Sequence, residues 1–396
     1  MKPDDLGYKE SLIYRLDTYG NDTFVKASEY SSSFPNTPYQ HVRHYATSGF
    51  EGILAVRDAN NEWYILTLEE NLDRMQKTMK QLFLTQPEAL EASLEEKRKL
   101  FSDIPGEPVA LKDAPLFLDA NKDKIREAIM ETLKINAEKG YLDLDAKDGL
   151  IYIRPNFYRD HKLDENGNLV PGLGVASLSH HAVLEIMVQN VPNYLASAPK
   201  SGARILVYDE ELHRRVIGLP PSDTPHLGFS GMSRKAKLGA NYGAGGMVKN
   251  LANLLGFDEG LLTDHDRNVL EGGGENAFMI KDNKVYTPPL TQAILPGTKR
   301  NLVIKITRAL GYELIEKKIP LEDFINADAA AFSGTWTGFE PLGSVVNWNP
   351  KMESNYRPHR IFGNVSEQYS NYLQGYPLDS RLEKVLPEKA HIDFSR

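Results

Sequence analysis

The chain has 396 residues, of which 41% are hydrophobic, a formal net charge of −8 and no cysteine. The acidic balance argues against nucleic acid as the main partner, and the lack of cysteine excludes disulfides, thiolate metal sites and thiol nucleophiles. No stretch reaches the roughly 20 apolar residues of a membrane span and no secretory signal opens the chain, so we expect a cytoplasmic protein with a small-molecule ligand, no membrane partner and no metal site.

The first half of the chain mixes strand-like and helical patterns. The predicted elements are strands at 52–56 and 63–66, a helix from about Asn71, a helix at 123–139, and strands at 150–157 and 175–188. In the first helix, Leu72, Met75 and Met79 recur at helical spacing, and Gly140 ends the second helix. The charged segment 86–99 is typical of a solvated helix face, and we assign it no function.

The pattern changes after residue 202, where strands and helices alternate more closely. The predicted elements are a strand at 204–208, a Pro- and Gly-rich connection at 218–231, a helix at 241–255, short strands around Leu261, Phe278 and Val285, a helix at 298–310, a strand at 312–319, a helix at 321–327 and a strand at 329–332. We therefore predict an α/β (α+β) fold of two domains, residues 1–200 and 201–396, with the boundary near 198–202.

An ordered set of motifs in the second half carries the chemistry. Lys237-Leu-Gly-Ala-Asn-Tyr242 opens a predicted helix, and Glu271-Gly-Gly-Gly-Glu-Asn follows it, then Thr-Pro-Pro and Ile-Leu-Pro-Gly297. This set resembles the fold-type-IV pyridoxal-phosphate enzymes over about a hundred residues. The resemblance implies two domains with pyridoxal 5′-phosphate bound at their interface, a smaller N-terminal domain for substrate recognition and a larger C-terminal domain for the cofactor.

The chemistry of this cofactor explains the residue types. A lysine amine that loses its proton in a partly desolvated pocket can form a Schiff base with the cofactor aldehyde and later act as a base. The resemblance gives Lys237 both roles. It places Glu271 beside the ring nitrogen, where a buried carboxylate favours the protonated form, and Tyr242 beside the ring hydroxyl.

The phosphate of the cofactor needs backbone N–H groups at a helix start and a cation. The segment from Ile294 to Lys299 opens a predicted helix, and Leu-Asp-Arg74 resembles the phosphate-binding arginine segment of the family. Many branched-chain transaminases have a hydroxyl residue where Lys299 stands, so two alternatives stay open: the phosphate is held here by backbone N–H groups alone, or with a second cation. The cofactor-binding residues that the resemblance implies are Arg74, Tyr242, Glu271, Leu295, Thr298, Lys299 and Thr335.

The first half points to one kind of aminotransferase. Tyr152-Ile-Arg154-Pro matches the Tyr-Ile-Arg-Pro of the branched-chain family, and the segment 44–52, with Phe50-Glu-Gly at its end, resembles a second family motif. The resemblance implies that Tyr152 and backbone N–H groups near Trp336 hold the substrate α-carboxylate. It also implies that Phe50 lines the apolar side-chain pocket and that Arg154, helped by Tyr45 and Tyr194, takes the distal carboxylate of glutamate. The substrate-binding residues it implies are Tyr45, Phe50, Tyr152, Arg154, Tyr194, Trp336 and Thr337, where the family usually has small alanines at the last two.

The resulting hypothesis is transamination of branched-chain or other hydrophobic L-amino acids with 2-oxoglutarate and glutamate, in a homodimer. Other reactions on the same fold stay open: a D-amino-acid transaminase, an amine transaminase or an aminodeoxychorismate-lyase-like enzyme. A non-catalytic protein that binds the cofactor or a metabolite also stays open. The adjacent His180 and His181 point to opposite faces of a predicted strand, which favours structural roles over a shared metal.

Overall fold

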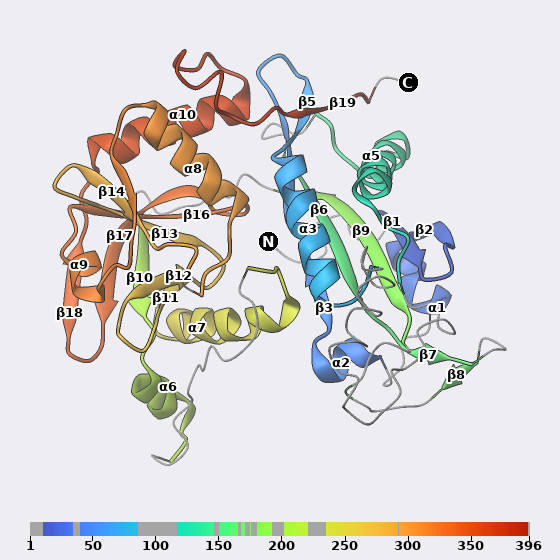
Figure 1. Cartoon of the computed structure of the whole chain (residues 1–396), viewed down its shortest axis with the longest axis horizontal. Coiled ribbons are helices and arrows are strands. Elements are labelled where there is room, and N and C mark those ends of the chain that lie inside the picture. The colour runs from blue at the N-terminus through green and yellow to red at the C-terminus, as the bar shows by residue number, and fades with distance from the viewer. Residues whose placement is uncertain are drawn as a thin grey trace, which may run out of the picture.

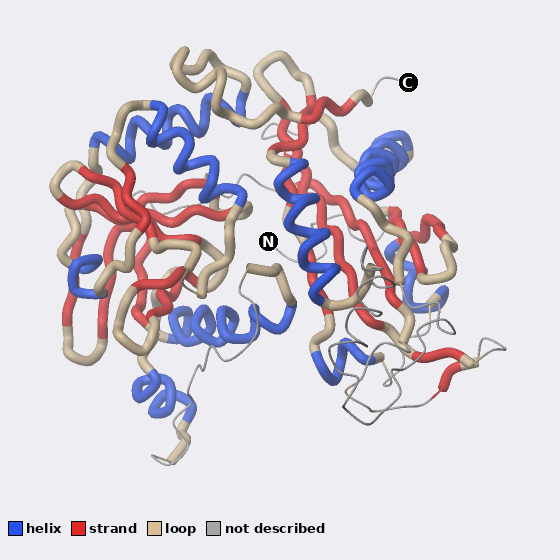
Figure 2. The backbone as a smooth tube through the Cα atoms, viewed as in Figure 1, coloured by secondary structure: helices blue, strands red, loops and turns tan. Residues whose placement is uncertain are grey.

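The computed structural model describes residues 11–34, 40–85, 117–145, 150–164, 168–170, 175, 180–191, 202–220, 235–291 and 293–394. These residues form two large sheets, each covered by helices, and a small two-stranded sheet of β7 (Lys162–Leu163) and β8 (Leu169–Val170) (Figure 1). The mixture of helices and strands, which Figure 2 colours separately, confirms the predicted α/β (α+β) class.

The first sheet is antiparallel, with the order β19-β5-β4-β6-β9-β1-β2 and with β3 pairing with β6. Its strands are β1 (Leu12–Asp17), β2 (Asp22–Lys26), β3 (Ser48–Phe50), β4 (Ile53–Arg57), β5 (Trp63–Leu66), β6 (Leu150–Arg159), β9 (Ala182–Asn190) and β19 (Ala390–Ile392). The pairing of β19 with β5 returns the end of the chain to its first sheet. This return is a feature that the sequence patterns did not predict.

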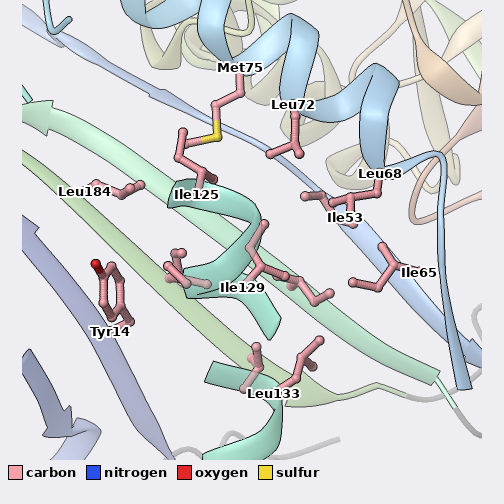
Figure 3. Close-up of a cluster of buried hydrophobic side chains, with 14 of the residues drawn as sticks. Tyr14, Ile53, Ile65, Leu68, Leu72, Met75, Ile125, Ile129, Leu133 and Leu184 are labelled. Atoms are coloured by element: carbon pink, nitrogen blue, oxygen red, sulfur yellow. The ribbon is translucent and has the colours of Figure 1, made fainter. Parts of the chain in front are cut away.

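One face of the first sheet is covered by α3 (Leu68–Gln81) and α5 (Lys122–Glu138). Leu72 and Met75 of α3 and Ile125 and Ile129 of α5 are fully buried against the sheet (Figure 3). Each such side chain contributes about 1.5–3 kcal/mol by leaving water. The helical spacing of apolar residues therefore predicted both helices correctly. Gly140 follows α5 with a positive φ of 70°, a backbone conformation that commonly ends a helix.

The second sheet is mixed, with the order β12-β11-β10-β17-β16-β13-β14-β15, and β18 pairs with β17. Its strands are β10 (Ala203–Val207), β11 (Glu259–Thr263), β12 (Val269–Gly272), β13 (Asn276–Lys281), β14 (Lys284–Thr287), β15 (Leu314–Glu316), β16 (Ala329–Gly334), β17 (Gly338–Asn347) and β18 (Met352–Asn355). An additional pairing between β12 and β13 closes part of the sheet into a ring. The ring brings the ends of β12 and β16 to the same region.

Helices surround the second sheet and complete its core. They are α6 (Glu210–Ile217), α7 (Tyr242–Leu254), α8 (Thr298–Ala309), α9 (Leu321–Ile325) and α10 (Arg360–Gln374), while the short α1 (Tyr30–Ser33) and α2 (His41–Tyr45) lie in the first half (Figure 1). Leu302 of α8 and Phe362 of α10 share one hydrophobic cluster with Leu54 and Tyr152 of the first sheet. This shared cluster packs the two halves against each other.

The side-chain alternation along β6 decides which residues face the second half. Ile151 and Ile153 lie in the core of the first half, whereas Tyr152 lies in the cluster shared with the second half. Successive side chains of a strand point to opposite faces, so Arg154 shares the face of Tyr152. The predicted site residues of β6 are thus on the side where the two halves meet.

Several predicted elements differ from the structure. Of the strand predicted at 175–188, residues 176–179 lie outside the described residues, and β9 begins at Ala182, after both histidines. The strand predicted at 312–319 is shortened to β15. The elements that were not predicted also include the strands β1, β2, β3, β7, β8, β12, β17 and β18 and the helices α1, α2, α6 and α10. The segment 86–99 lies outside the described residues, and the two-domain division with its boundary near 198–202 stays a prediction. Among the described helices, none is long and apolar enough to cross a membrane.

Candidate active site

Lys237 lies just before α7 and is fixed by contacts with the first half of the chain. Its backbone N–H donates to the Thr78 hydroxyl at 3.0 Å, and its carbonyl accepts from the Phe50 N–H at 3.2 Å. Thr78 belongs to α3 and Phe50 to β3. The lysine backbone therefore connects the two halves, and its side chain starts from a defined position.

The amine of Lys237 lies among aromatic rings and donates a hydrogen bond to the Tyr242 hydroxyl. The amine nitrogen lies 4.9 Å from the centre of the Phe50 ring and 4.8 Å from that of Tyr242. Burial, and next the positive charge of Arg74, lower the pKa of Lys237 to about 7, while burial raises the pKa of Tyr242. A neutral, nucleophilic amine is therefore well populated at neutral pH, next to a phenol that keeps its proton.

Glu271 stands near the end of β12 with 9% of its surface exposed. Its carboxylate accepts the Leu295 N–H at 2.9 Å and the side-chain amide of Asn276 at 3.3 Å. The same amide donates to the Leu295 carbonyl at 2.9 Å. Glu271, Leu295 and Tyr242 line one cavity. The structure thus brings the predicted carboxylate and the predicted phenol to the same space.

The start of α8 offers donors that nothing in the described part of the chain uses. Gly297, the residue before the helix, is extended and makes no side-chain cap, which leaves the first N–H groups free of an intrahelical partner. The Thr298 hydroxyl is buried and has no hydrogen-bond partner among the described residues. A Cβ at position 297 would meet the Asn276 amide oxygen at 2.2 Å, so only glycine fits there. Free N–H groups with an unpaired buried hydroxyl fit a phosphate group.

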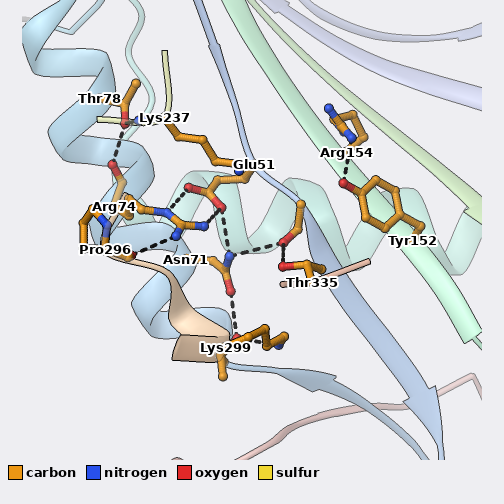
Figure 4. Close-up of polar contacts among 12 residues, drawn as sticks. Glu51, Asn71, Arg74, Thr78, Tyr152, Arg154, Lys237, Pro296, Lys299 and Thr335 are labelled. Carbon is orange, nitrogen blue, oxygen red and sulfur yellow. Dashed lines mark hydrogen bonds and ion pairs between the residues drawn. The ribbon is translucent and has the colours of Figure 1, made fainter. Parts of the chain in front are cut away.

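Arg74 of α3 points toward this helix start, but its charge is already paired (Figure 4). Its Nε and Nη2 donate to the two carboxylate oxygens of Glu51 at 2.8 and 2.7 Å, and its Nη1 donates to the Pro296 carbonyl at 3.0 Å. Glu51 is fully buried. The Phe50-Glu-Gly motif predicts no role for this glutamate. Its position between two strands, where a charged residue is unusual, is the signal that could have indicated one.

Lys299 and Thr335 join the same polar network from the second half. The Lys299 amine donates to the Thr67 hydroxyl at 3.0 Å, and that hydroxyl donates to the side-chain oxygen of Asn71 at 2.9 Å. The amide of Asn71 donates in turn to Glu51 at 2.8 Å, and the Thr335 hydroxyl donates to the Gly52 carbonyl at 3.2 Å. Figure 4 shows these contacts around Asn71. Sequence reasoning missed Thr67 and Asn71, because nothing in their local pattern marks them.

The substrate-side residues form a stack that ends at Phe50. Arg154 donates from Nη2 to the Tyr152 hydroxyl at 2.7 Å, and its guanidinium lies 4.5 Å from the centre of the Phe50 ring and 5.0 Å from that of Tyr152. Trp336, which is 42% exposed, packs edge-on against Tyr152 with 5.0 Å between the ring centres. Phe50 also contacts the Lys237 amine. The stack therefore leads from Trp336 to the lysine.

Three predicted substrate residues are not brought to this stack by their described contacts. The described ring contacts of Tyr45 are with His41 and His44 in α2. The Thr337 hydroxyl donates to Glu275 at 3.0 Å, next to the turn between β12 and β13. Tyr194 lies outside the described residues. Substrate roles for these three residues stay predictions.

Comparison with known proteins gives a consistent family. A family model described as amino-transferase class IV matches residues 49–345. A protein of Staphylococcus epidermidis named "probable branched-chain-amino-acid aminotransferase" is 26% identical over 377 residues, which cover 93% of this chain and 87% of the relative.

Solved structures share the fold at lower identity. A branched-chain aminotransferase from Thermoproteus uzoniensis with norvaline is 21% identical, with a TM-score of 0.68 over 97% of this chain and 100% of that one. The branched-chain amino acid aminotransferase from Thermobaculum terrenum, in its PLP-form or holo-form, is 18% identical, with a TM-score of 0.66 over 96% of this chain and 98% of that one.

Proposed function

Because the chain belongs to the class IV aminotransferases and its cofactor is pyridoxal 5′-phosphate, we propose that it transfers the amino group of branched-chain or other hydrophobic L-amino acids to 2-oxoglutarate. The observation that carries the proposal is the stack of Phe50, Arg154 and Tyr152 beside the Lys237 amine. It combines apolar surface for a hydrophobic side chain with a cation for the glutamate side chain. The names of the relatives point to the same substrates.

The proposal gives each polar residue of the site a task. The bound cofactor supplies an electron sink for the negative charge that develops at the substrate Cα. Lys237 would hold the cofactor through its aldehyde and would carry the proton taken from the substrate Cα. Glu271 holds the proton on the ring nitrogen, Tyr242 binds the ring hydroxyl, and the Leu295 N–H orients Glu271. The phosphate is assigned to Thr298, Lys299, Arg74 and Thr335, which surround the start of α8.

Substrate recognition is assigned to the stack and to the turn between β16 and β17. In this proposal Tyr152 and the backbone near Trp336 and Thr337 hold the α-carboxylate, and Phe50 contacts the apolar side chain. Arg154 has no ion pair within the described ranges, so its guanidinium is available for a distal carboxylate. An uncompensated carboxylate in such a pocket would cost several kcal/mol, which is why the second substrate needs this cation.

We also propose a homodimer in which neighbouring subunits complete each other's pockets. In this proposal Tyr45 and Tyr194 help Arg154 to bind the distal carboxylate. A cytoplasmic location stays a prediction of the sequence alone.

The experiment that tests the substrate class separates the two half-reactions in Arg154→Met. The cofactor-loaded variant is mixed in single turnovers with leucine or with glutamate, and the absorbance of the lysine-bound cofactor is followed. Loss of one charge-assisted hydrogen bond should slow the glutamate reaction by roughly 10- to 100-fold and leave the leucine reaction nearly unchanged. Arg57→Met is the matched control, because Arg57 belongs to the same sheet and its partner is Asp145.

Three other outcomes would reject the dual-substrate proposal. Equal slowing of both reactions would place Arg154 at the α-carboxylate. No effect on either reaction would remove Arg154 from the pocket. Cofactor binding without consumption by any L-amino acid would favour a D-amino-acid or amine substrate, or a protein that binds the cofactor without catalysis.

A further inference from the structure

Lys299 is a buried lysine without a counter-ion. It is 2% exposed, its amine has one hydrogen-bond partner, the Thr67 hydroxyl, and within the described ranges no carboxylate lies within ion-pair distance of it. Glu70 on the facing helix acts on Lys299 electrostatically but is itself paired with Lys305 at 3.5 Å. Burying an ammonium without a partner is costly, so a lysine at this position calls for an anion that the described residues do not supply.

The positive charge of Arg74 is not sufficient by itself to neutralise a bound phosphate. Glu51 occupies two of its N–H edges and the Pro296 carbonyl occupies a third, so the pair of Arg74 and Glu51 is electrically neutral. A phosphate monoester carries about −1.5 to −2 charges near pH 7. The start of α8 contributes only a partial positive charge, equivalent to about half an elementary charge. Of the described residues around the start of α8, the neutral pair of Arg74 and Glu51 and the helix end leave about one full positive charge to be supplied, and Lys299 can supply it.

Lys299 stands in the right place for this role. It is the second residue of α8, directly after Thr298, whose buried hydroxyl has no partner among the described residues. Its amine is held by Thr67, a residue with a left-handed backbone (φ 54°) at the start of α3, and Thr67 is held by Asn71. Asn71 also binds Glu51, so one chain of hydrogen bonds joins the amine to the carboxylate that orients Arg74.

We propose that Lys299 is the second cation of the cofactor's phosphate site, that Thr67 and Asn71 position its amine, and that phosphate binding is accompanied by uptake of a proton on Lys299. This inference rests on the proposed function only through the assigned cofactor. In this role Lys299 gives the site a positive charge that responds to phosphate binding.

The proton uptake follows from the groups that surround the amine. Burial lowers the pKa of Lys299 from 10.5 to about 8, Glu70 and Glu51 oppose this shift, and Arg74 adds to it. Above pH 8 the amine of the phosphate-free protein is mostly neutral. A phosphate beside it favours the charged form and raises the pKa again. Phosphate binding therefore takes up a proton between about pH 8 and 10.5, and phosphate affinity falls as the pH rises through this window.

The first test compares two ligands that differ only in the phosphate. Dissociation constants for pyridoxal 5′-phosphate and for pyridoxal are measured in cofactor-free protein from the absorbance of the lysine-bound form. Lys299→Met should weaken binding of the phosphorylated ligand by about tenfold or more and leave pyridoxal unchanged. Lys305→Met is the control, because Lys305 lies on the same helix and is paired with Glu70. Equal affinities of wild type and Lys299→Met for the phosphorylated ligand would overturn the inference.

A second test needs no variant and uses inorganic phosphate as the probe. Calorimetric titrations of the wild-type protein near pH 9, in two buffers with different ionisation enthalpies, give the number of protons taken up. We expect clear proton uptake near pH 9, where Lys299 is mostly neutral before phosphate binds and the free phosphate is already a dianion. No uptake at pH 9 would overturn the inference. If the wild-type protein forms no lysine-bound cofactor, the proposed function is wrong. If the wild type binds the cofactor and Lys299→Met binds it equally well, only the inference about Lys299 is wrong.

Discussion

Arg74 and Glu51 form a two-pronged ion pair in which both side chains are almost completely buried, with N–O distances of 2.8 and 2.7 Å. The pair ties α3 to the turn between β3 and β4, and the third donor of Arg74 ties α3 to the Pro296 carbonyl before α8. The phosphate side of the site is therefore built from both halves of the chain.

The ion pair gives a prediction about stability. Arg74→Met should lower the free energy of unfolding by about 3–5 kcal/mol, because it leaves the Glu51 carboxylate buried without a partner. The double variant Arg74→Met/Glu51→Gln should recover part of this loss. Urea unfolding of cofactor-free protein measures both. Arg126→Met, which breaks exposed ion pairs with Glu69 and Asp123, should change stability by less than about 1 kcal/mol. A loss in Arg74→Met as small as in this control would contradict the role of the pair.

Glu271 gives a prediction about catalysis. Glu271→Gln keeps the shape of the side chain but removes the charge that favours a protonated ring nitrogen, so turnover should fall by roughly 100-fold or more while the cofactor stays bound. Steady-state rates at full cofactor loading, judged by absorbance, measure the effect. Glu313→Gln, at an exposed residue paired with Lys284, serves as the control. Unchanged turnover in a fully loaded Glu271→Gln enzyme would mean that another group faces the ring nitrogen.

The lowered pKa of Lys237 gives a prediction about pH. Burial and Arg74 disfavour the charged amine, so the neutral form appears as the pH rises through about 7 instead of 10.5. The rate of cofactor attachment to cofactor-free protein should rise with pH and level off above about pH 8. Because the unfolded chain holds this proton up to about pH 10.5, the same group makes the folded protein more stable as the pH rises from 7 to 10.5. Stopped-flow mixing measures this rate. A rate that still rises tenfold per pH unit at pH 9 would contradict a lowered pKa of Lys237.

Local signals predicted much of the fold. Four helices were predicted from features that act within a few residues. These features are the apolar spacing of Leu72 and Met75 in α3 and the glycine after each of α5, α7 and α8. The short α6 has a comparable signal that was overlooked: the Asp209 carboxylate accepts the Leu212 N–H at 2.8 Å, and Gly218 ends the helix. Strands β12 and β17 have weaker patterns, since their burial depends on the ring that the whole second sheet forms.

The site likewise contains residues that local motifs predict and contacts that only long-range packing creates. Motifs marked Lys237, Glu271 and Tyr242, and the structure brings Tyr242 both to the lysine amine and to the cavity of Glu271. The partner of Arg74 and the route from Lys299 through Thr67 depend on how α3 packs against α8, which no local pattern contains. The sequence motifs therefore predict the residues that carry the chemistry, whereas the ion pairs and hydrogen bonds around them depend on long-range packing.

The central claim is that Lys237 carries the cofactor. The most direct test reduces the cofactor-loaded protein with borohydride, digests it and locates the modified lysine by mass spectrometry. Lys299 is the built-in competitor, because it is a buried lysine at the start of α8 and its pKa is lowered to about 8. We predict modification at Lys237 alone, and in Lys237→Ala no modified lysine and no turnover in a folded protein. Modification at Lys299 or another lysine in the wild type, or near-normal turnover of Lys237→Ala, would contradict the account.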